Sequence, residues 1–266
     1  MSLDKIEPTK LKFLNAHPRD EFIHFDEGPH IYTVHGEQGY TSVTTWNHSH
    51  FSHFDADEII EKTMKSKKMQ DPNYKYYGMT KQQILDSWEK NRKEASEAGT
   101  KTHYNIECYY NDMDVDDDSI EYIYFKNFRR DNANLKPYRT EWCVYHEELK
   151  LSGSIDMVFK DEDNDEFYIY DWKRSKGIEY DNYYDKTAIT ECINHLPDTN
   201  FWHYSLQLNV YRRILQEKYG MKITKLCLVV LHPDNPIGNY EVVKVDILDR
   251  EIEDLWQFRK KQLENQ

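Results

Sequence analysis

The sequence predicts an α/β or α+β fold in which helices flank a mixed central β-sheet. Three observations favour this class. Strand-like apolar segments gather in the second half of the chain, amphipathic helical segments precede and separate them, and no Pro/Gly/Ser-rich linker interrupts the sequence. We therefore expect one domain over residues 1–266, with N-terminal strands and helices over 1–98, a core over 99–246 and a closing helix over 247–266.

The N-terminal part is expected to be mainly helical. Gly28-Pro29 is a typical turn and separates two apolar segments, and Gly99 lies between two stretches of helical periodicity. The expected segments are an irregular lead-in over 1–20, two short strands within 21–34, a hydroxyl-rich turn or helix entry over 40–46, helices over 55–67, 80–98, 100–110 and 120–130, and an acidic loop over 112–119.

Strands dominate the rest of the chain. Residues 225–232 (KLCLVVLH) form a continuous apolar run, which is typical of a strand buried on both faces, and the helix that precedes this strand ends before Gly220, a common C-terminal residue. The expected segments are strands over 138–145, 150–159 and 166–173, a helix over 202–219, strands over 225–232 and 240–245, and a helix over 247–263.

Composition excludes several classes of protein. The chain is 38% hydrophobic and 14% aromatic, which argues against disorder, and it contains no apolar run of about 18 residues that could cross a membrane. Its N-terminus lacks the apolar segment of a signal peptide. We expect an intracellular protein, cytoplasmic or in the nucleoid, without a membrane partner; a viral or phage origin stays open.

The spacing of the cysteines and the motifs in the sequence limit which cofactors can be expected. The four cysteines form no C-x-x-C pair, so we expect reduced thiols and no iron–sulfur cluster. No G-x-x-x-x-G-K-[ST] motif occurs, so no nucleotide cofactor is expected and a helicase activity would require a partner.

The net charge of −13 argues against non-specific coating of nucleic acid. Local basic patches, each typical of a solvated helix face, could together line a groove for phosphates.

The segment 152–176 contains the clearest chemical signal. Asp171 and Lys173 are two residues apart on a predicted strand and therefore share a face, with Trp172 on the other. If the two strands of this segment form a hairpin, Asp156 lies beside Asp171. Carboxylates bind Mg²⁺, and a lysine can orient water or stabilise a phosphate, so the pattern favours metal-assisted phosphodiester hydrolysis. The alternative is a solvated strand face, where Asp and Lys are common.

Two helical pairs could complete this site. His103 and Glu107 are four residues apart and share a helix face, and both side chains can bind Mg²⁺ or Mn²⁺. Gln207 and Tyr211 have the same spacing and could contact substrate or a metal-bound water. The alternatives are a surface His–Glu pair and a helix that packs Tyr211 against the sheet.

Taken in order, these residues resemble a known family. The set is G-x-x-x-H-x-x-x-E (Gly99, His103, Glu107), G-x-x-D (Gly153, Asp156), D-W-K (Asp171, Trp172, Lys173) and Q-x-x-x-Y (Gln207, Tyr211). It is similar to the PD-(D/E)XK nuclease superfamily, in its RecB-like and lambda-exonuclease-like branch, over about residues 99–232. The family's Pro-Asp dipeptide is replaced here by Ile155-Asp156.

The resemblance implies a restriction-endonuclease-like core that hydrolyses DNA with one or two Mg²⁺ or Mn²⁺ ions. It implies that His103, Asp156, Asp171 and the Trp172 carbonyl bind metal, that Lys173 positions the attacking water, and that Gln207 and Tyr211 assist. Glu107 would either bind an outer metal ion or hold the metal ligands from behind without binding metal itself.

We expect the substrate to be DNA, at linear ends or as single strands, and exonuclease action. The residues expected to contact DNA are Ser42, Thr44, Lys101, Arg174 and Lys176. Ser42 and Thr44 could equally cap the next helix. A structure-selective endonuclease, an RNA nuclease and a non-catalytic nucleic-acid-binding protein are the alternatives, and homo-oligomers and a helicase or recombination partner stay open.

Overall fold

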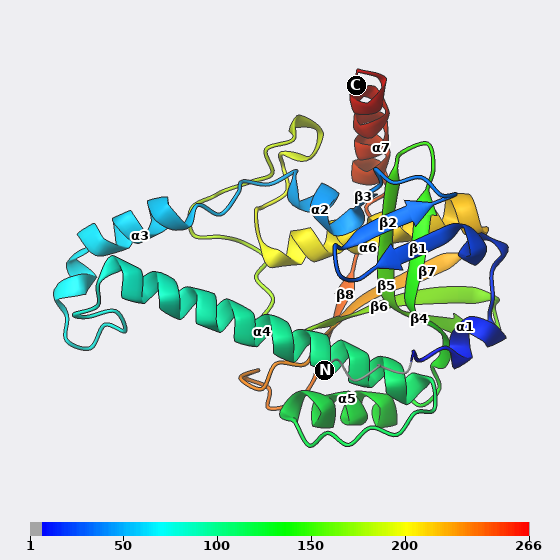
Figure 1. Cartoon of the computed structure of the whole chain (residues 1–266), viewed down its shortest axis with the longest axis horizontal. Helices are drawn as coiled ribbons and strands as arrows, with labels where there is room; N and C mark the ends of the chain where they lie inside the picture. The colour runs from blue at the N-terminus through cyan, green and yellow to red at the C-terminus, as the bar shows by residue number, and fades with distance from the viewer. Residues whose placement is uncertain (1–6, 266) are drawn as a thin grey trace. The chain divides into compact units, whose positions relative to one another are not determined.

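The computed structural model describes residues 7–265, and Figure 1 shows the arrangement of its helices and strands. In chain order the elements are α1 (Lys10–Leu14), η1 (Pro18–Phe22), β1 (Ile23–Asp26), β2 (Ile31–Val34), β3 (Thr41–Ser42), α2 (Val43–His48), α3 (Ala56–Lys65), η2 (Lys67–Gln70), α4 (Lys81–Tyr110), α5 (Ile120–Asp131), β4 (Lys136–His146), β5 (Leu151–Asp161), β6 (Glu166–Lys173), η3 (Glu191–Ile193), α6 (Asn200–Tyr219), β7 (Ile223–Val230), β8 (Glu241–Val245) and α7 (Asp249–Glu264).

The chain divides into two compact units. One comprises the residues up to Ser52 together with those from Thr102 onward, and the other comprises His53–Lys101. The sequence pattern predicts separate helices over 80–98 and 100–110, whereas α4 continues through Gly99 as one helix. The unit of His53–Lys101 is helical and has its own small core of Ile60, Tyr76 and Ile84.

The larger unit is built on a six-stranded mixed sheet, which confirms the predicted central sheet flanked by helices. The β4–β5, β5–β6 and β7–β8 pairs are antiparallel, whereas β6 and β7 are parallel. A parallel connection needs a crossover, and α6 provides it. Helix α6 contacts β4, β6 and β7. It is drawn in yellow beside the green β4–β5 pair in Figure 1.

Two hydrophobic clusters cover the sheet, one on each face. The first joins α2, α6 and α7 to sheet residues such as Trp142, Ile169 and Leu228. The second joins the end of α4 and all of α5 to Tyr170, Trp172 and others. Alternate residues of β6 therefore enter opposite clusters, as expected for a central strand with both faces covered.

The structure corrects three expectations for the N-terminal region. Residues 10–14 and 18–22 of the predicted irregular lead-in are helical, as α1 and η1, while residues 1–6 of that lead-in lie outside the described residues. The turn or helix entry predicted at 40–46 does lead into α2, but it also contains β3, which pairs in parallel with the start of β5. Two residues are too few to produce a recognisable strand pattern.

No helix in the described part of the chain is long and apolar enough to cross a membrane. Cys108 and Cys227 are buried, Cys143 and Cys192 are half-buried, and no disulfide joins any of these four cysteines, all of which lie in the described part of the chain.

Candidate metal centre

The candidate site lies where β5 changes its neighbour. Strand β4 pairs with β5 along one edge, from Leu151 to Lys160. On the other edge, β3 pairs with Leu151 and Ser152, and β6 pairs with β5 from Met157 onward. The intervening residues 153–156 have no strand partner on that edge among the described pairings. The edge of the sheet is therefore open at Asp156, and a side chain can replace the missing backbone contacts.

Asp156 bridges this opening. Its Oδ2 accepts a hydrogen bond of 2.9 Å from the backbone N–H of Trp172, which lies two residues beyond Tyr170, the last residue of β6 paired with β5. The predicted hairpin is confirmed, and the register brings Asp156 beside Asp171. The charge of Asp156 contributes to the raised pKa of Asp171, after the larger effect of burial.

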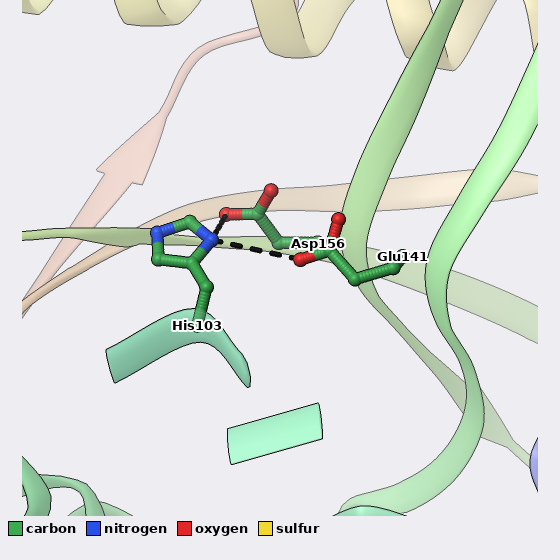
Figure 2. Close-up of side chains that lie close together, drawn as sticks. All are labelled: His103, Glu141 and Asp156. Atoms are coloured by element: carbon green, nitrogen blue, oxygen red, sulfur yellow. Dashed lines mark ion pairs between the residues drawn. The ribbon is translucent and has the colours of Figure 1, made fainter. Parts of the chain in front are cut away.

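His103 and Glu141 complete a group of three potential metal ligands with Asp156. Nδ1 of His103 lies 3.5 Å from Oδ2 of Asp156 and 3.6 Å from Oε1 of Glu141. One ligand atom from each residue falls within 4.8 Å of the other two. Figure 2 shows His103 on its helix, with Nδ1 facing the two carboxylates on the strands. The other ring nitrogen, Nε2, lies 3.0 Å from the carbonyl oxygen of Trp172.

The backbone at Glu141 explains why sequence patterns did not reveal this residue. Glu141 has φ of +41°, a left-handed conformation in the middle of β4. Such a backbone conformation in a residue other than glycine costs about 1–3 kcal/mol and is common at functional sites. The regular alternation also fails in β5, because Ile155 and Met157 belong to clusters on opposite faces. Ser154 donates a 3.0 Å hydrogen bond to Oε2 of Glu141 and orients its carboxylate.

Lys173 and Asp171 form the second part of the site. Nζ of Lys173 lies 2.6 Å from Oδ2 of Asp171 and 4.5 Å from the centre of the Tyr204 ring. Both charged groups are largely removed from solvent, with side-chain exposures of 17% and 3%. A buried ion pair is costly to desolvate, so its position at the end of a core strand favours a functional role.

The electrostatics of the site suit a divalent cation. Burial raises the pKa of Asp156, and burial followed by the charge of Asp156 raises the pKa of Asp171 to about 6. Burial lowers the pKa of His103, but Asp156 and Glu141 outweigh it and raise this pKa to about 9. Three carboxylates therefore share the positive charge of His103 and Lys173. An oxygen-rich donor set with one imidazole fits Mg²⁺ and Mn²⁺.

The two predicted auxiliary residues lie on α6, beside β5. Tyr211 is 2% exposed, and Gln207 hydrogen-bonds its phenol group. A Cβ atom at Gly153 would lie only 2.5 Å from the phenol oxygen of Tyr211. Glycine at this position therefore lets Tyr211 approach the open edge of β5, close enough for Asp156 and Asp171 to affect its pKa. Tyr211 therefore both packs against the sheet and lies near Asp156 and Asp171.

The remaining predicted site residues have other surroundings. Glu107 is half-buried one turn after His103 on α4, and the carboxylate beside His103 is that of Glu141. The backbone of Trp172 contacts Asp156 and His103, while its side chain is buried on the opposite face.

The residues expected to contact DNA mostly have protein partners. Ser42 caps α2 by accepting a hydrogen bond from the N–H of Thr45, whereas Thr44 is exposed. Arg174 pairs with the buried Glu121 at 2.7 Å, and Lys176 pairs with Asp234 at 3.0 Å. Lys101 is exposed and belongs to the unit of His53–Lys101. Binding of a phosphate by Arg174 or Lys176 would thus compete with an existing carboxylate.

Comparison with known proteins identifies no relative from which a function could be transferred. No protein-family model matches the chain, and no curated protein sequence matches it. The family resemblance stated above accordingly depends on four short motifs and on their order along the chain. The arrangement that these motifs adopt, with His103, Asp156 and the Asp171–Lys173 pair at one opening of a mixed sheet, is the evidence on which a function can be proposed.

Proposed function

We propose that this protein is a metal-dependent DNA nuclease with a restriction-endonuclease-like core, and that it acts as an exonuclease. One observation carries the proposal: the ligand atoms of His103, Glu141 and Asp156 converge where β5 and β6 separate, beside the buried Asp171–Lys173 pair. The element order is also that of the proposed core, in which a helix supplies His103, three antiparallel strands follow, and a crossover helix leads to a parallel strand.

Two sets of donors share Asp156. His103, Glu141 and Asp156 form one set, whose ligand atoms lie close together. The other set would comprise Asp156, Asp171 and the Trp172 carbonyl. The first would hold one Mg²⁺ or Mn²⁺ ion, and the second would hold another if two ions bind. A bound divalent ion would activate water and neutralise the scissile phosphate.

The protein's own groups would orient the reactants. Lys173 is fixed by its ion pair with Asp171 and by the Tyr204 ring, so its ammonium can hold the attacking water and the negative charge that develops on the phosphate. Ser154 holds the Glu141 carboxylate, and the Trp172 N–H holds that of Asp156. These contacts reduce the reorganisation required during the reaction.

A cleavage assay tests this proposal. Purified protein is incubated with end-labelled linear duplex, single-stranded DNA, covalently closed circles and RNA, with Mg²⁺, Mn²⁺ or EDTA. We expect metal-dependent loss of linear DNA and survival of closed circles. Lys173→Ala, Asp171→Ala and Glu141→Gln should each reduce the rate, the first two by about 10²–10³-fold or more.

The matched control is Asp163→Ala, which removes an exposed carboxylate from the turn of the same hairpin and should leave the rate unchanged. Cutting of circles would assign an endonuclease, and cleavage of RNA alone would replace DNA as the substrate. Absence of cleavage on every substrate would contradict the proposal.

A further inference from the structure

A cavity of about 560 Å³ lies between the end of α4, the following acidic loop and α5. Its lining includes three tyrosines, two cations and two acids: Tyr109, Tyr110, Tyr122, Lys126, Arg129, Asp112 and Asp114. Asp112 forms an ion pair with Lys10. The volume falls within the range of small-molecule binding sites. Three aromatic rings and two cationic side chains in one cavity suit a ligand that combines a planar ring with an anionic group.

The hydroxyl group of Tyr110 has no hydrogen-bond partner among the described residues. Tyr110 is only 5% exposed, so water does not satisfy this hydroxyl freely. Buried tyrosine hydroxyls normally have a partner, and leaving one unsatisfied destabilises the fold. A bound ligand with an acceptor oxygen would supply the missing partner.

Arg129, which lines the same cavity, lies close enough to Tyr110 to act on its phenol group. The charge of Arg129 acts on Tyr110 strongly enough to lower the pKa of the phenol, against the larger effect of burial, which raises it. Among the described residues, Arg129 donates one hydrogen bond, of 3.0 Å, from Nη1 to the carbonyl of Asn132. A guanidinium group has five N–H donors, so others could bind a ligand. Nζ of Lys126 lies 5.2 Å from the centre of the Tyr122 ring, so one cation and one aromatic face are already adjacent.

The cavity is separate from the metal centre. The Tyr110 ring stacks on Trp172 with centroids 6.4 Å apart and an interplanar angle of 17°. Trp172 points to the face of β6 opposite Asp171 and Lys173, since alternate residues of a strand face opposite ways. A ligand in the cavity would therefore lie behind Trp172 and would not contact the site proposed for catalysis.

We propose that this cavity binds a nucleoside 5′-monophosphate, with the phosphate at Arg129, Lys126 and the Tyr110 hydroxyl and the base against Tyr109 and Tyr122. Arginine and lysine are the usual partners of phosphate, and bases stack on tyrosine rings. The exposed carboxylate of Asp114 can accept hydrogen bonds from the sugar or from an amino group of the base. The choice of ligand depends on the proposed function, because exonuclease cleavage of DNA releases 5′-mononucleotides.

Calorimetric titration of the full-length protein with each 5′-deoxynucleoside monophosphate, in EDTA, tests this inference. EDTA removes binding through metal ions. We expect saturable binding, with inorganic phosphate and the deoxynucleosides each binding at least about tenfold more weakly. Tyr110→Phe, which removes only the hydroxyl, and Arg129→Gln should each weaken binding about tenfold. The control is Arg130→Gln, because Arg130 is exposed and pairs with Asp131, and this variant should bind as the wild type does.

The same titration separates this inference from the nuclease proposal. Binding that persists in Lys173→Ala, which is expected to be inactive, would support a separate cavity. Binding lost in Lys173→Ala would place the nucleotide at the metal centre and overturn the inference, as would unchanged binding in Tyr110→Phe and Arg129→Gln or absence of binding in EDTA. Nucleotide binding without any cleavage would contradict the nuclease proposal alone.

Discussion

The two faces of β6 differ in almost every physical respect. On one face, Asp171 and Lys173 form a buried ion pair beside the open edge of β5. On the other, Tyr170 and Trp172 pack among the aromatic residues of α4 and α5. The comparison shows that one eight-residue strand can support the candidate chemistry with one set of side chains and anchor the fold with the other. The anchor holds the backbone of Trp172, which contacts both Asp156 and His103.

The charged face contains features that lower the stability of the fold, and the aromatic face does not. Glu141 adopts a left-handed backbone conformation within a strand, and burial raises the pKa of Asp156, so ionised Asp156 is destabilised. Residues of functional sites commonly lower the free energy of unfolding in this way. Substitutions on the aromatic face should therefore reduce stability, whereas a neutral substitution on the charged face should increase it.

The largest expected effect is on the aromatic face. Trp172→Ala should lower the free energy of unfolding by about 3–5 kcal/mol, because it removes a side chain that is 2% exposed and contacts Phe125 and Phe128. Urea denaturation measures the loss. Tyr183→Ala is the control, since Tyr183 is 92% exposed and its removal should cost little. Equal losses in the two variants would contradict the anchoring role of Trp172.

An intermediate effect is expected at the contact between Gly153 and α6. Gly153→Ala should destabilise the protein by about 1–3 kcal/mol, because the new Cβ would lie 2.5 Å from the Tyr211 hydroxyl and 2.8 Å from its Cε1. Adding Tyr211→Phe removes the closest contact and should restore part of the loss. Gly177→Ala, where a Cβ would meet no atom within 4 Å, is the control in thermal denaturation. Full stability of Gly153→Ala would show that Tyr211 has room to move.

The smallest expected effect has the opposite sign. In metal-free protein at pH 7, Asp156→Asn should increase the free energy of unfolding by about 1 kcal/mol. The folded-state pKa of Asp156 is raised by burial, even though His103 and Lys173 attract the charged form. The folded protein therefore binds this proton more tightly than the unfolded chain does, and the stability from Asp156 is lost as pH rises through the raised pKa. Asparagine avoids that loss.

Denaturation of wild type and Asp156→Asn at pH 4 and pH 7 measures this effect. The two proteins should differ less at pH 4 than at pH 7, because the raised pKa leaves a larger share of Asp156 protonated in the folded state at the lower pH. The variant should also lose the stabilisation by Mn²⁺ that we expect for the wild type. A variant less stable than metal-free wild type at pH 7 would show that the charged face contributes to the fold instead of opposing it.

The sequence by itself determined the order of the core elements and most of the candidate site. Strand periodicity placed Asp171 and Lys173 on one face and Trp172 on the other, and the hairpin pattern placed Asp156 beside Asp171; the pairing register confirms both. These inferences succeeded because they depend on local geometry: side chains alternate along a strand, and a short turn determines which residues of a hairpin meet.

Only the tertiary structure decided which other residues reach that site. Glu141 joins it through a left-handed backbone that breaks the strand pattern, and it is Glu141, not the predicted Glu107, whose carboxylate lies beside His103. Arg174 and Lys176 resembled phosphate-binding residues, yet each is paired with a carboxylate from a distant segment. Contacts of this kind depend on which surfaces the packed helices and strands bring together. Side-chain periodicity describes one element at a time and contains no information about its distant neighbours.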